Sequence, residues 1–509
     1  MLPCLWATLS RVHSVDDYGA IRHEQTGRAA QANQRAFSAA AAALQPGDTF
    51  LVPRSGSYRV RGGLALSSLR DVTLQFQGSI DADDDIDAWP RDSSNETLPF
   101  LSLQNATNVT ITGGGTIDGH GMRWWDAAVN GKIGSHNTRP HLLEIAAASG
   151  LVLERLTLLD SPRFHVVFDS SADVTVRYLN ITVDRFAQRT LRAAAHAKRI
   201  AALGAHWGMV AAPVARRLAR AERRHLVEAA PAEDGAAVYG VGGDGWWKDW
   251  LLDQLVKLLP SWALQPEDLN TDGIDPNGVR FHIHDCAITN DDDSIAVKPS
   301  NAAKPYPCTR DLLLENLTLT GFGASIGSVS PHADVGCVRN VTFRHISMPG
   351  TGKGIYIKSN PQCGRAPDRH GVMTDETAII EGITYENVSM DRPFWWAVWI
   401  GPQQQHEPHS ALGGKCALEW PAGHSACPTQ GCVTFANITL RDVRIDRPAL
   451  SPGVVLGNAS NPMRNVTFED VRTNFGPDWA SGRAPWGRAY KCEHAAVRSV
   501  GATDPKPCA

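Results

Sequence analysis

The chain has 509 residues, which at about 100–200 residues per domain predicts several domains unless one elongated fold takes up the whole length. Hydrophobic residues make up 43% of the chain and charged residues 20%, so the chain is globular rather than disordered. The 49 Lys and Arg residues against 53 Asp and Glu residues give a net charge of −4, which excludes a global basic field and with it nucleic acid as an expected partner.

The N-terminal residues 1–10 are weakly apolar and lack both a charged start and a clear small-residue cleavage site, so a signal peptide is not evident. They fit either a truncated signal or the approach to a first strand. No apolar run approaches the roughly 18–20 residues of a spanning helix, so we expect no membrane span. We infer an extracellular protein from the cysteines and glycosylation sequons described below.

One local pattern recurs along most of the chain: a polar turn followed by a short alternating run of Val, Ile, Leu, Phe and Thr, which is strand periodicity. Repeats at intervals of about 20–50 residues indicate a solenoid, and a strand-only unit of this size predicts a parallel β-helix whose coils stack about 4.8 Å apart. We therefore expect an all-β fold, one single-stranded β-helix domain over residues 1–509. The copies lie at 69–81, 106–118, 149–160, 171–183, 276–289, 309–321, 338–350, 380–392, 435–447 and 463–474.

Ten N-x-S/T sequons accompany these repeats, and those reading N-V-T or N-I-T lie at the turn into a strand. Two interpretations are equally supported at each site. Asn tolerates the left-handed conformation of a turn and can hydrogen-bond to a neighbouring coil. Glycosylation is the alternative. The sequons begin at Asn95, Asn105, Asn108, Asn180, Asn316, Asn340, Asn387, Asn437, Asn458 and Asn465.

Residues 185–263 break the pattern and are helical in composition, so we expect a helical insertion there. From Arg185 to Arg224 the insertion holds ten Lys or Arg residues and one acid, Glu222. It fits either a basic lid that attracts an acidic polymer or a surface insertion without catalytic consequence, and we favour the second.

Ten cysteines are present, none in a C-x-x-C pair, and eight lie beyond residue 300. Disulfides that hold C-terminal loops are favoured over buried thiols, and residues 476–509 are expected to form a C-terminal tail of this kind. The cysteines are Cys4, Cys286, Cys308, Cys337, Cys363, Cys416, Cys427, Cys432, Cys492 and Cys508.

The densest acidic cluster lies at residues 270–298. Asp272 and Asp292 are about one coil apart, so stacking brings them together, with Asp291 and Asp293 beside them. Clustered carboxyls resist full ionisation, so one keeps its proton beside ionised neighbours, as glycosidic cleavage requires. A calcium site and a loop of solvated acids are the alternatives.

Several segments resemble the polygalacturonases, glycoside hydrolase family 28, in their order along residues 15–475 outside the insertion. NTDGID and NDDDSIAVK are similar to the NTDG and D-D motifs of that family. Each motif alone is moderately specific, and the ordered set is strongly so. The other matching segments are VDDYGAI (15–21), GTIDGHGMRWW (115–125), SPRFH (161–165), GFGASIGS (321–328) and GIYIK (354–358).

The resemblance implies a right-handed β-helix and an inverting hydrolase of pectin-type polysaccharides. It implies Asp292 as the general acid, Asp272 and Asp293 as the groups that activate water, and Lys358 as a ligand of a substrate carboxylate or hydroxyl. Asn270, the first residue of NTDG, is an expected substrate contact. Because regular strand alternation would send Asp292 and Asp293 to opposite faces, a bend is required between them.

Two positions depart from the family pattern: Phe322 stands where the family has a histidine, and Tyr356 where it has an arginine. These aromatic side chains are suited to stacking on a sugar face, which favours a less acidic or branched glycan. Asp291, where the family often has an uncharged residue, adds charge repulsion toward Asp292. His332, in the next loop, is a candidate to take the place of the histidine that Phe322 replaces, although the role of an ordinary surface-loop residue is favoured for it.

The tryptophans Trp395, Trp396 and Trp399 are interpreted as packing residues rather than as a sugar platform. Three functions compete: a hydrolase of a galacturonan-like polymer, a calcium-dependent lyase that uses Lys298 or Lys358 as its base, and an inactive solenoid that binds glycans. The hydrolase is favoured because Asp272, Asp292 and Asp293 occur together. We expect no cofactor and no resident metal, a polysaccharide as the partner, and a monomer.

Overall fold

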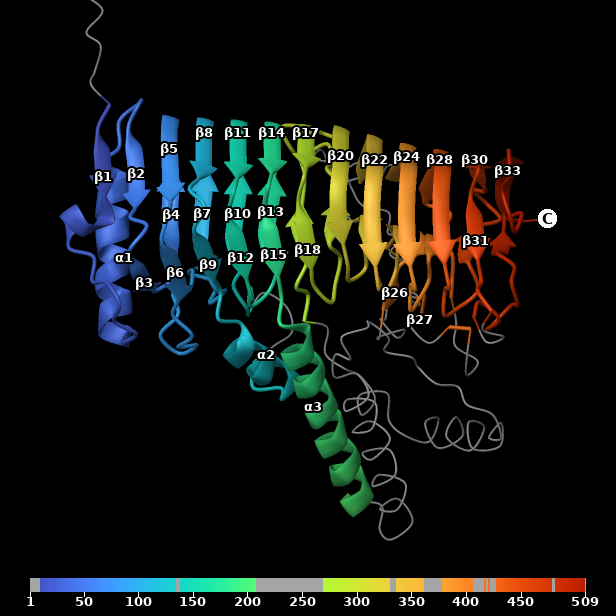
Figure 1. The fold of residues 1–509 in the computed structure, drawn as a ribbon, viewed down its shortest axis with the longest axis horizontal. Coiled ribbons are helices and arrows are strands. Elements are labelled where there is room, and N and C mark those ends of the chain that lie inside the picture. Colours follow the sequence, from blue (N-terminus) through green and yellow to red (C-terminus); the bar gives the residue numbers. More distant parts are fainter. Residues whose placement is uncertain are drawn as a thin grey trace, which may run out of the picture.

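The computed structural model describes residues 10–133, 138–206, 269–329, 336–360, 378–405, 416–417, 420–421, 427–477 and 481–508. They form one long stack of parallel coils, with the first coil and the last at opposite ends (Figure 1). Every pair of neighbouring strands in the two main sheets is parallel, so the all-β prediction of a β-helix is confirmed.

An 11-stranded sheet forms one wall of the stack. Its strands pair in register from coil to coil, as in Ile274 with Ile295 and Ile295 with Ala324. The strands are β4 (Leu64–Ser67), β7 (Leu101–Gln104), β10 (Leu143–Ala146), β13 (Val166–Asp169), β16 (Ile274–Asp275), β19 (Ile295–Val297), β21 (Ala324–Val329), β23 (Ile355–Ser359), β25 (Val398–Pro402), β29 (Gly453–Leu456) and β32 (Lys491–Glu493).

A 20-stranded sheet forms the other walls as two rows that merge in its longest strands. The first row is β1 (Val12–Ser14), β2 (Thr49–Val52), β5 (Arg70–Phe76), β8 (Thr107–Thr112), β11 (Ser149–Glu154), β14 (Ser171–Arg177), β17 (Gly278–His284), β20 (Thr309–Leu319), β22 (Cys337–Pro349), β24 (Ala378–Asp391), β28 (Val433–Asp446), β30 (Met463–Glu469) and β33 (Ala495–Val500). The second row is β3 (Ser57–Val60), β6 (Ser79–Ala82), β9 (Thr116–Asp118), β12 (Thr157–Leu159), β15 (Asn180–Thr182), β18 (Ala287–Thr289) and β31 (Arg472–Asn474). A separate pair joins β26 (Gln404–Gln405) to β27 (Cys416–Ala417).

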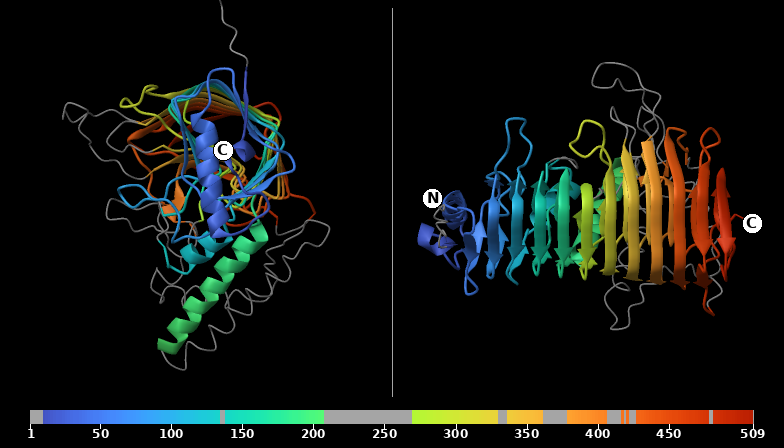
Figure 2. Two further views of the ribbon diagram at one scale, coloured as in Figure 1. Left: turned by 90° about the vertical axis from the view of Figure 1, so that its left-hand side faces the viewer. Right: turned by 90° about the horizontal axis from the view of Figure 1, so that it is seen from above.

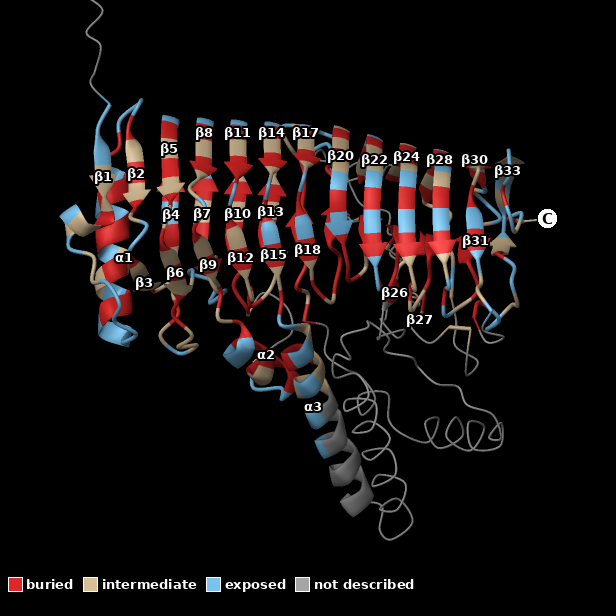
Figure 3. Cartoon of the chain, in the orientation of Figure 1, coloured by how far each residue is buried: buried red, intermediate tan, exposed pale blue. Residues whose placement is uncertain are grey.

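Many strands of the 20-stranded sheet alternate between buried and more exposed residues (Figure 3), and the buried apolar side chains form one continuous core along the stack. In β5, for example, Val72, Leu74 and Phe76 are buried, whereas Thr73 and Gln75 between them are partly exposed. Because this core is continuous along the stack, one β-helix accommodates most of the described residues.

Left-handed backbone recurs at one equivalent position near the start of the first-row strands. Asn108 and Asn340 have φ of 53° and 50°, and each donates a side-chain hydrogen bond to the preceding coil, to Asp71 at 2.6 Å and to Asp311 at 2.7 Å. Asn437 and Asn465 occupy the same position with φ of 54° and 53°, 2.7 Å apart through their amides. The expected left-handed conformation and hydrogen bonds between coils are confirmed for these four sequon asparagines, although they lie within the strands rather than before them. Their glycosylation stays a prediction.

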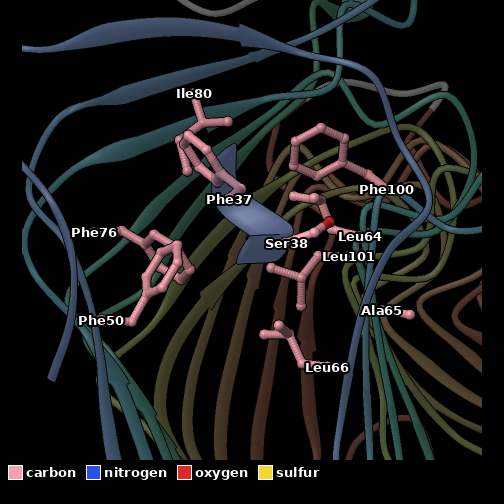
Figure 4. A pocket seen from close by; sticks show the side chains of 10 residues that line it. All are labelled: Phe37, Ser38, Phe50, Leu64, Ala65, Leu66, Phe76, Ile80, Phe100 and Leu101. Carbon is pink, nitrogen blue, oxygen red and sulfur yellow. The ribbon is translucent and has the colours of Figure 1, made fainter. Parts of the chain in front are cut away.

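Helix α1 (Gly27–Ala42) covers the N-terminal end of the stack, after a 3₁₀ turn at Val15–Tyr18 (Figure 2, left). Thr26 begins the helix by accepting a hydrogen bond from the Ala29 N–H at 3.1 Å. Phe37 of α1 packs edge-on against Phe50 and Tyr58. Beneath α1 an apolar hollow is lined by the rings of Phe37 and Phe50 and by leucines such as Leu64 and Leu101 (Figure 4), so it belongs to the core.

Disulfides join Cys308 to Cys337, Cys416 to Cys427, and Cys492 to Cys508. The prediction of disulfides beyond residue 300 is therefore confirmed. The last of the three lies within residues 476–509. Cys286 is the exception among the described cysteines, because it is a buried free thiol whose pKa burial raises to about 12.

Two helices lie on the same side of the stack, α2 (Met122–Val129) and α3 (Arg185–His206) (Figure 1). They contact each other through a small apolar cluster of their own. Helix α3 is the start of the expected insertion, and residues 207–263 lie outside the described residues. In the part of the chain that the structure describes, no helix is long and apolar enough to cross a bilayer.

Candidate active site

The acidic segment predicted as the chemical centre lies in the turn between the second row of the 20-stranded sheet and the 11-stranded sheet. Residues 290–294 form a bend between β18 and β19, and residues 270–273 precede β16 in the coil before it. The bend that Asp292 and Asp293 require is therefore present. Five carboxyl groups from these two adjacent coils lie here with side chains from the two coils that follow, those of Asp272, Asp275, Asp291, Asp292 and Asp293.

Asp272 and Asp293 occupy equivalent places in adjacent coils. Each lies two residues before the paired Ile274 and Ile295, and the Gly273 N–H donates a hydrogen bond to the Asp293 carbonyl at 2.9 Å. Their exposed fractions are 3% and 1%. The predicted stacking of this acidic segment in adjacent coils is found, but Asp293 rather than Asp292 lies opposite Asp272.

Asp292 is held within the bend by its own neighbours. Its Oδ1 accepts a hydrogen bond from the Asp293 N–H at 2.8 Å, and its exposed fraction is 8%. The Asn290 amide, fully buried, donates to the carbonyls of Thr271 and Asp293 at 2.9 Å each and so joins the two coils. Glycine is required opposite, because a Cβ at Gly321 would lie 2.3 Å from the Asp292 carbonyl oxygen.

Asp293 is contacted from the two following coils. Ser325 of β21 donates its hydroxyl to Asp293 Oδ1 at 2.8 Å, and the Lys358 ammonium of β23 contacts Oδ2. Lys358 is 6% exposed, so this ion pair is shielded from bulk water. The predicted substrate ligand Lys358 is thus brought into the acidic cluster.

Two further residues of the cluster, Asp275 and Lys298, were missed as members of the predicted catalytic set. The Lys298 ammonium lies 3.2 Å from Asp272 Oδ2 and 3.2 Å from Asp275 Oδ2. Burial raises the pKa of Asp275 well above its ordinary value. Burial alone would lower the pKa of Lys298, but the charges of Asp275 and Asp272 raise it, which disfavours Lys298 as a neutral base. The second Asp of NTDGID was the available signal.

His165, in the SPRFH segment, supports Asp272 from the preceding coil. Its N–H and its Nδ1 each lie 2.9 Å from the Asp272 carbonyl oxygen, and the Ser161 N–H donates to Nε2 at 3.3 Å. The Nδ1–H tautomer satisfies both contacts. Because His165 is fully buried, its pKa is lowered to about 4, so the ring is neutral.

The two departures from the family pattern surround a buried lysine. The ammonium of Lys353, which is 1% exposed, lies 3.9 Å from the ring centre of Tyr356 and 5.2 Å from that of Phe322. Lys358 lies 4.5 Å from the same Tyr356 ring. The Tyr356 ring, 2% exposed, therefore lies close to two cations. Its predicted stacking on a sugar stays a prediction, as does that of the partly exposed Phe322.

Apolar side chains on the outer face of the 11-stranded sheet bury Tyr356 further. Trp396 and Trp399 are 1% and 0% exposed in this outer cluster, which confirms them as packing residues. The Tyr356 hydroxyl accepts a hydrogen bond from the Gln404 N–H at 3.0 Å. Position 356 is therefore part of a packed layer beside the cluster of acids.

The remaining predicted residues are placed as follows. Asn270 precedes Asp272 with a left-handed φ of 43° and is partly exposed. The buried Arg139 donates to the Leu269 and Pro162 carbonyls, so it joins this segment to the coil before it. His332 lies outside the described residues.

Asp291 does not add an uncompensated charge beside Asp292. Its carboxylate accepts hydrogen bonds from Arg185 at 2.6 Å and from Arg189 at 2.8 and 2.9 Å. Burial would raise its pKa, but these arginines lower it below the ordinary value. The expected repulsion toward Asp292 is therefore offset by side chains of α3.

The calcium interpretation of the NDDD run is not supported by its contacts, because the Asp291 and Asp293 oxygens bind arginine and lysine side chains. Within the described residues, the one group of three side chains spaced for a metal is Asp81, Asp118 and His120, in other coils. The site thus combines buried carboxyl groups with ammonium groups, a set that can exchange protons and bind an anionic or hydroxylated substrate.

A family model described as glycosyl hydrolases family 28 matches residues 46–190 and 263–414, more than half of the chain. A polygalacturonase from Persea americana is 28% identical over 183 residues, 35% of this chain and 37% of the relative. An endo-polygalacturonase from Pectobacterium parmentieri is 26% identical over 396 residues, 75% of this chain and 66% of the relative. The chain spans only about a third of the length of the plant polygalacturonases that it matches.

Solved structures share the fold. An endo-xylogalacturonan hydrolase from Aspergillus tubingensis superposes with a TM-score of 0.60 at 16% identity, covering 96% of this chain and all of the other. A polygalacturonase from Erwinia carotovora ssp. carotovora gives 0.54 at 19% identity, covering 91% and 92%. These likenesses confirm the right-handed parallel β-helix.

Proposed function

Because the chain belongs to glycosyl hydrolase family 28, we propose that it hydrolyses glycosidic bonds of a pectin-type, galacturonan-like polysaccharide with inversion at the anomeric carbon. The observation that carries the proposal is the meeting of Asp272, Asp292 and Asp293 in two adjacent coils, with Lys358 on Asp293. The relatives named as polygalacturonases support the class of substrate.

In this proposal Asp292 is the general acid and gives its proton to the glycosidic oxygen as the bond to the anomeric carbon breaks. A water molecule attacks that carbon from the opposite face and loses its proton to Asp272 or Asp293. Lys298 and Lys358 stabilise negative charge on these two carboxylates through charge-assisted hydrogen bonds. The products are two shorter glycans, and the acid and base are restored by exchange with water.

Lys358 binds the substrate in addition to its contact with Asp293. An ammonium group has three N–H donors, so a substrate carboxylate or hydroxyl can share it with Asp293. Asn270, partly exposed at the edge of the cluster, is a second substrate contact. Phe322, also partly exposed, offers an apolar ring beside the bend. The disulfides fit a secreted protein that acts outside the cell.

Release of reducing ends from a panel of polymers tests the proposal: polygalacturonate, rhamnogalacturonan, xylogalacturonan and neutral glycans. The comparison uses the unmodified protein and Asp292→Asn, with Asp17→Asn, an exposed carboxylate of the 3₁₀ turn, as the matched control. We expect release that Asp292→Asn loses by a factor of about 100 or more and Asp17→Asn keeps.

The products distinguish the competing functions. Proton NMR of the first sugars released should show inverted anomeric configuration. A product that absorbs in the ultraviolet and forms only when calcium is present would instead indicate a lyase. Folded protein that binds the polymers and releases nothing from any of them would favour a solenoid that binds glycans, the function to which Phe322 and Tyr356 give most support.

A further inference from the structure

Helix α3 begins directly at the acidic cluster. Its first two turns present Arg185 and Arg189 to Asp291, whose side chain is 7% exposed. Arg189 donates to both carboxylate oxygens through Nε and Nη2, and Arg185 donates to Oδ1 through Nε. A bidentate arginine with a second arginine beside it fixes both the position and the orientation of a carboxylate.

Helix α3 is itself anchored at this end. Asp184 precedes the helix and accepts a hydrogen bond from the Ala187 N–H at 2.8 Å. Gln188 is fully buried, and its amide lies 3.5 Å from the Thr271 hydroxyl, one residue before Asp272. Ala195 packs in an apolar cluster with Trp125 of α2 and with Leu269. The arginines therefore project from a helix whose start is fixed against both acidic coils.

We propose that α3 is a positioning element of the active site, in which Arg185 and Arg189 hold Asp291 and thereby the bend that carries Asp292 and Asp293. This inference rests on the proposed function for its catalytic consequence. Residues 290–294 belong to no strand. The carbonyls of Asp292 and Asp293 accept backbone hydrogen bonds from Phe322 and Gly273 of the neighbouring coils, and the side-chain contacts of Asp291 and Asn290 add to these in holding the bend.

The contact of Arg185 and Arg189 with Asp291 also has an electrostatic role. Without the two arginines, a buried carboxylate would stand one residue from Asp292, and burial of an uncompensated charge is costly. The Asp291 carboxylate would then move toward water or another cation, and the backbone of residues 290–294 would shift with it. A displacement of about 1 Å at a reacting group can lower a rate about 100-fold.

The test compares four proteins: the unmodified chain, Arg185→Ala/Arg189→Ala, Arg189→Lys, and Lys198→Ala as a matched change of an exposed charge farther along α3. The double variant should lower kcat about 10- to 100-fold with KM within about twofold, because the lost contacts do not touch substrate. Arg189→Lys keeps the charge without the bidentate geometry and should fall between. Lys198→Ala should match the unmodified protein.

Hydrogen exchange supplies a readout that needs no activity. Amides of residues 290–294 should exchange at least about tenfold faster in the double variant than in Lys198→Ala, while those of β22 stay protected. Adding Asp291→Asn to the double variant should recover part of kcat by removing the unpaired charge. If the double variant does not fold, Arg189→Lys carries the same comparison.

The outcomes separate the two proposals. Unchanged exchange in a folded double variant overturns the positioning role, whether or not the protein is active. Faster exchange with unchanged kcat overturns its catalytic consequence alone. If no polymer is cleaved by the unmodified protein, the proposed function fails, and faster exchange still shows that α3 orders the bend.

Discussion

The ammonium group of Lys358 contacts Oδ2 of Asp293 two coils away, and the side chains are only 8% and 2% exposed. Ser325, from the coil between them, binds the other oxygen of the same carboxylate. Three consecutive coils thus meet at one buried ion pair. Such a pair is costly to break on one side, because the remaining charge loses its partner without gaining water.

We therefore predict that Lys358→Met lowers the free energy of unfolding by about 3–5 kcal/mol and abolishes polymer cleavage. The matched variant Lys358→Met/Asp293→Asn removes both charges, so it should recover most of the stability and none of the activity. Urea unfolding followed by tryptophan fluorescence measures the first quantity. Equal stability of the single and double variants would contradict the prediction.

His165 predicts a loss of stability in acid. Its pKa is about 4 in the folded protein, against about 6.5 in an unfolded chain. Below pH 6.5 the unfolded chain binds a proton that the folded protein does not, so stability falls as the pH drops toward 4 and is unaffected above 6.5. At pH 5 this difference amounts to about 2 kcal/mol.

His165→Asn tests this prediction, because an amide can donate to the Asp272 carbonyl and does not titrate. Between pH 7.5 and pH 5.0 the unmodified protein should lose about 2 kcal/mol more of its free energy of unfolding than His165→Asn does. Other groups titrate alike in both proteins. Equal losses would show that burial does not depress the pKa of His165.

The left-handed backbone of Asn340 predicts a ranking of substitutions at this position. Its φ is 50°, and its amide donates to Asp311. Asn340→Ala should cost about 1–2 kcal/mol, because alanine keeps the Cβ that strains left-handed backbone and lacks the side-chain hydrogen bond that offsets this strain in asparagine. Asn340→Gly loses the same hydrogen bond without that strain, so it should cost at most about 1 kcal/mol. The two variants remove the same sequon, so a glycan affects both equally, and a reversed order would overturn the explanation.

Tyr356 cannot be returned to the family arginine without cost. Lys353 and Lys358 already lie 3.9 and 4.5 Å from its ring, so Tyr356→Arg would bring a third cation into a buried layer. We expect a loss of about 3 kcal/mol or more, against about 1–3 kcal/mol for Tyr356→Phe, which removes the hydroxyl that accepts the Gln404 N–H hydrogen bond.

Lys353→Met provides the control for that prediction. If crowding of charge causes the loss, the double variant Lys353→Met/Tyr356→Arg should be more stable than Tyr356→Arg alone. Differential scanning calorimetry of the four proteins decides the matter. An additive result would mean that shape rather than charge excludes arginine from position 356.

The sequence predicts the coils well because their determinants are local. Alternating apolar residues and the Asn suited to left-handed backbone are visible within one repeat. The spacing of about one coil predicts the stacking of Asp272 on the Asp292–Asp293 pair, although it does not predict that Asp293 is the one in register. The contact between Asp291 and Arg189 is different, since 102 residues separate them and no periodicity links a strand turn to a helix. The preference for a surface insertion without consequence rested on the composition of residues 185–263, which says nothing of where the first helix docks.

The burial of Tyr356 was the other feature that the sequence did not predict. Tyr356 occurs in a strand whose alternation sends it out of the central core, where a residue is normally exposed. The structure buries it in a second apolar layer outside the 11-stranded sheet, together with the disulfide-linked Cys416. The apolar layer on the outer face of the 11-stranded sheet is formed by residues far apart along the chain, and the repeat pattern does not predict it.

Helix α1 has a consequence for how the molecule ends. A stack of parallel coils exposes the backbone N–H and C=O groups of its first strands, which would invite a second molecule to continue the sheets. Here α1 contacts β1, β3 and β4, the strands at the first edge of both sheets. The backbone hydrogen bonding that joins one coil to the next would otherwise join one molecule to another and produce filaments. Helix α1 covers these strands and so blocks such growth at this end.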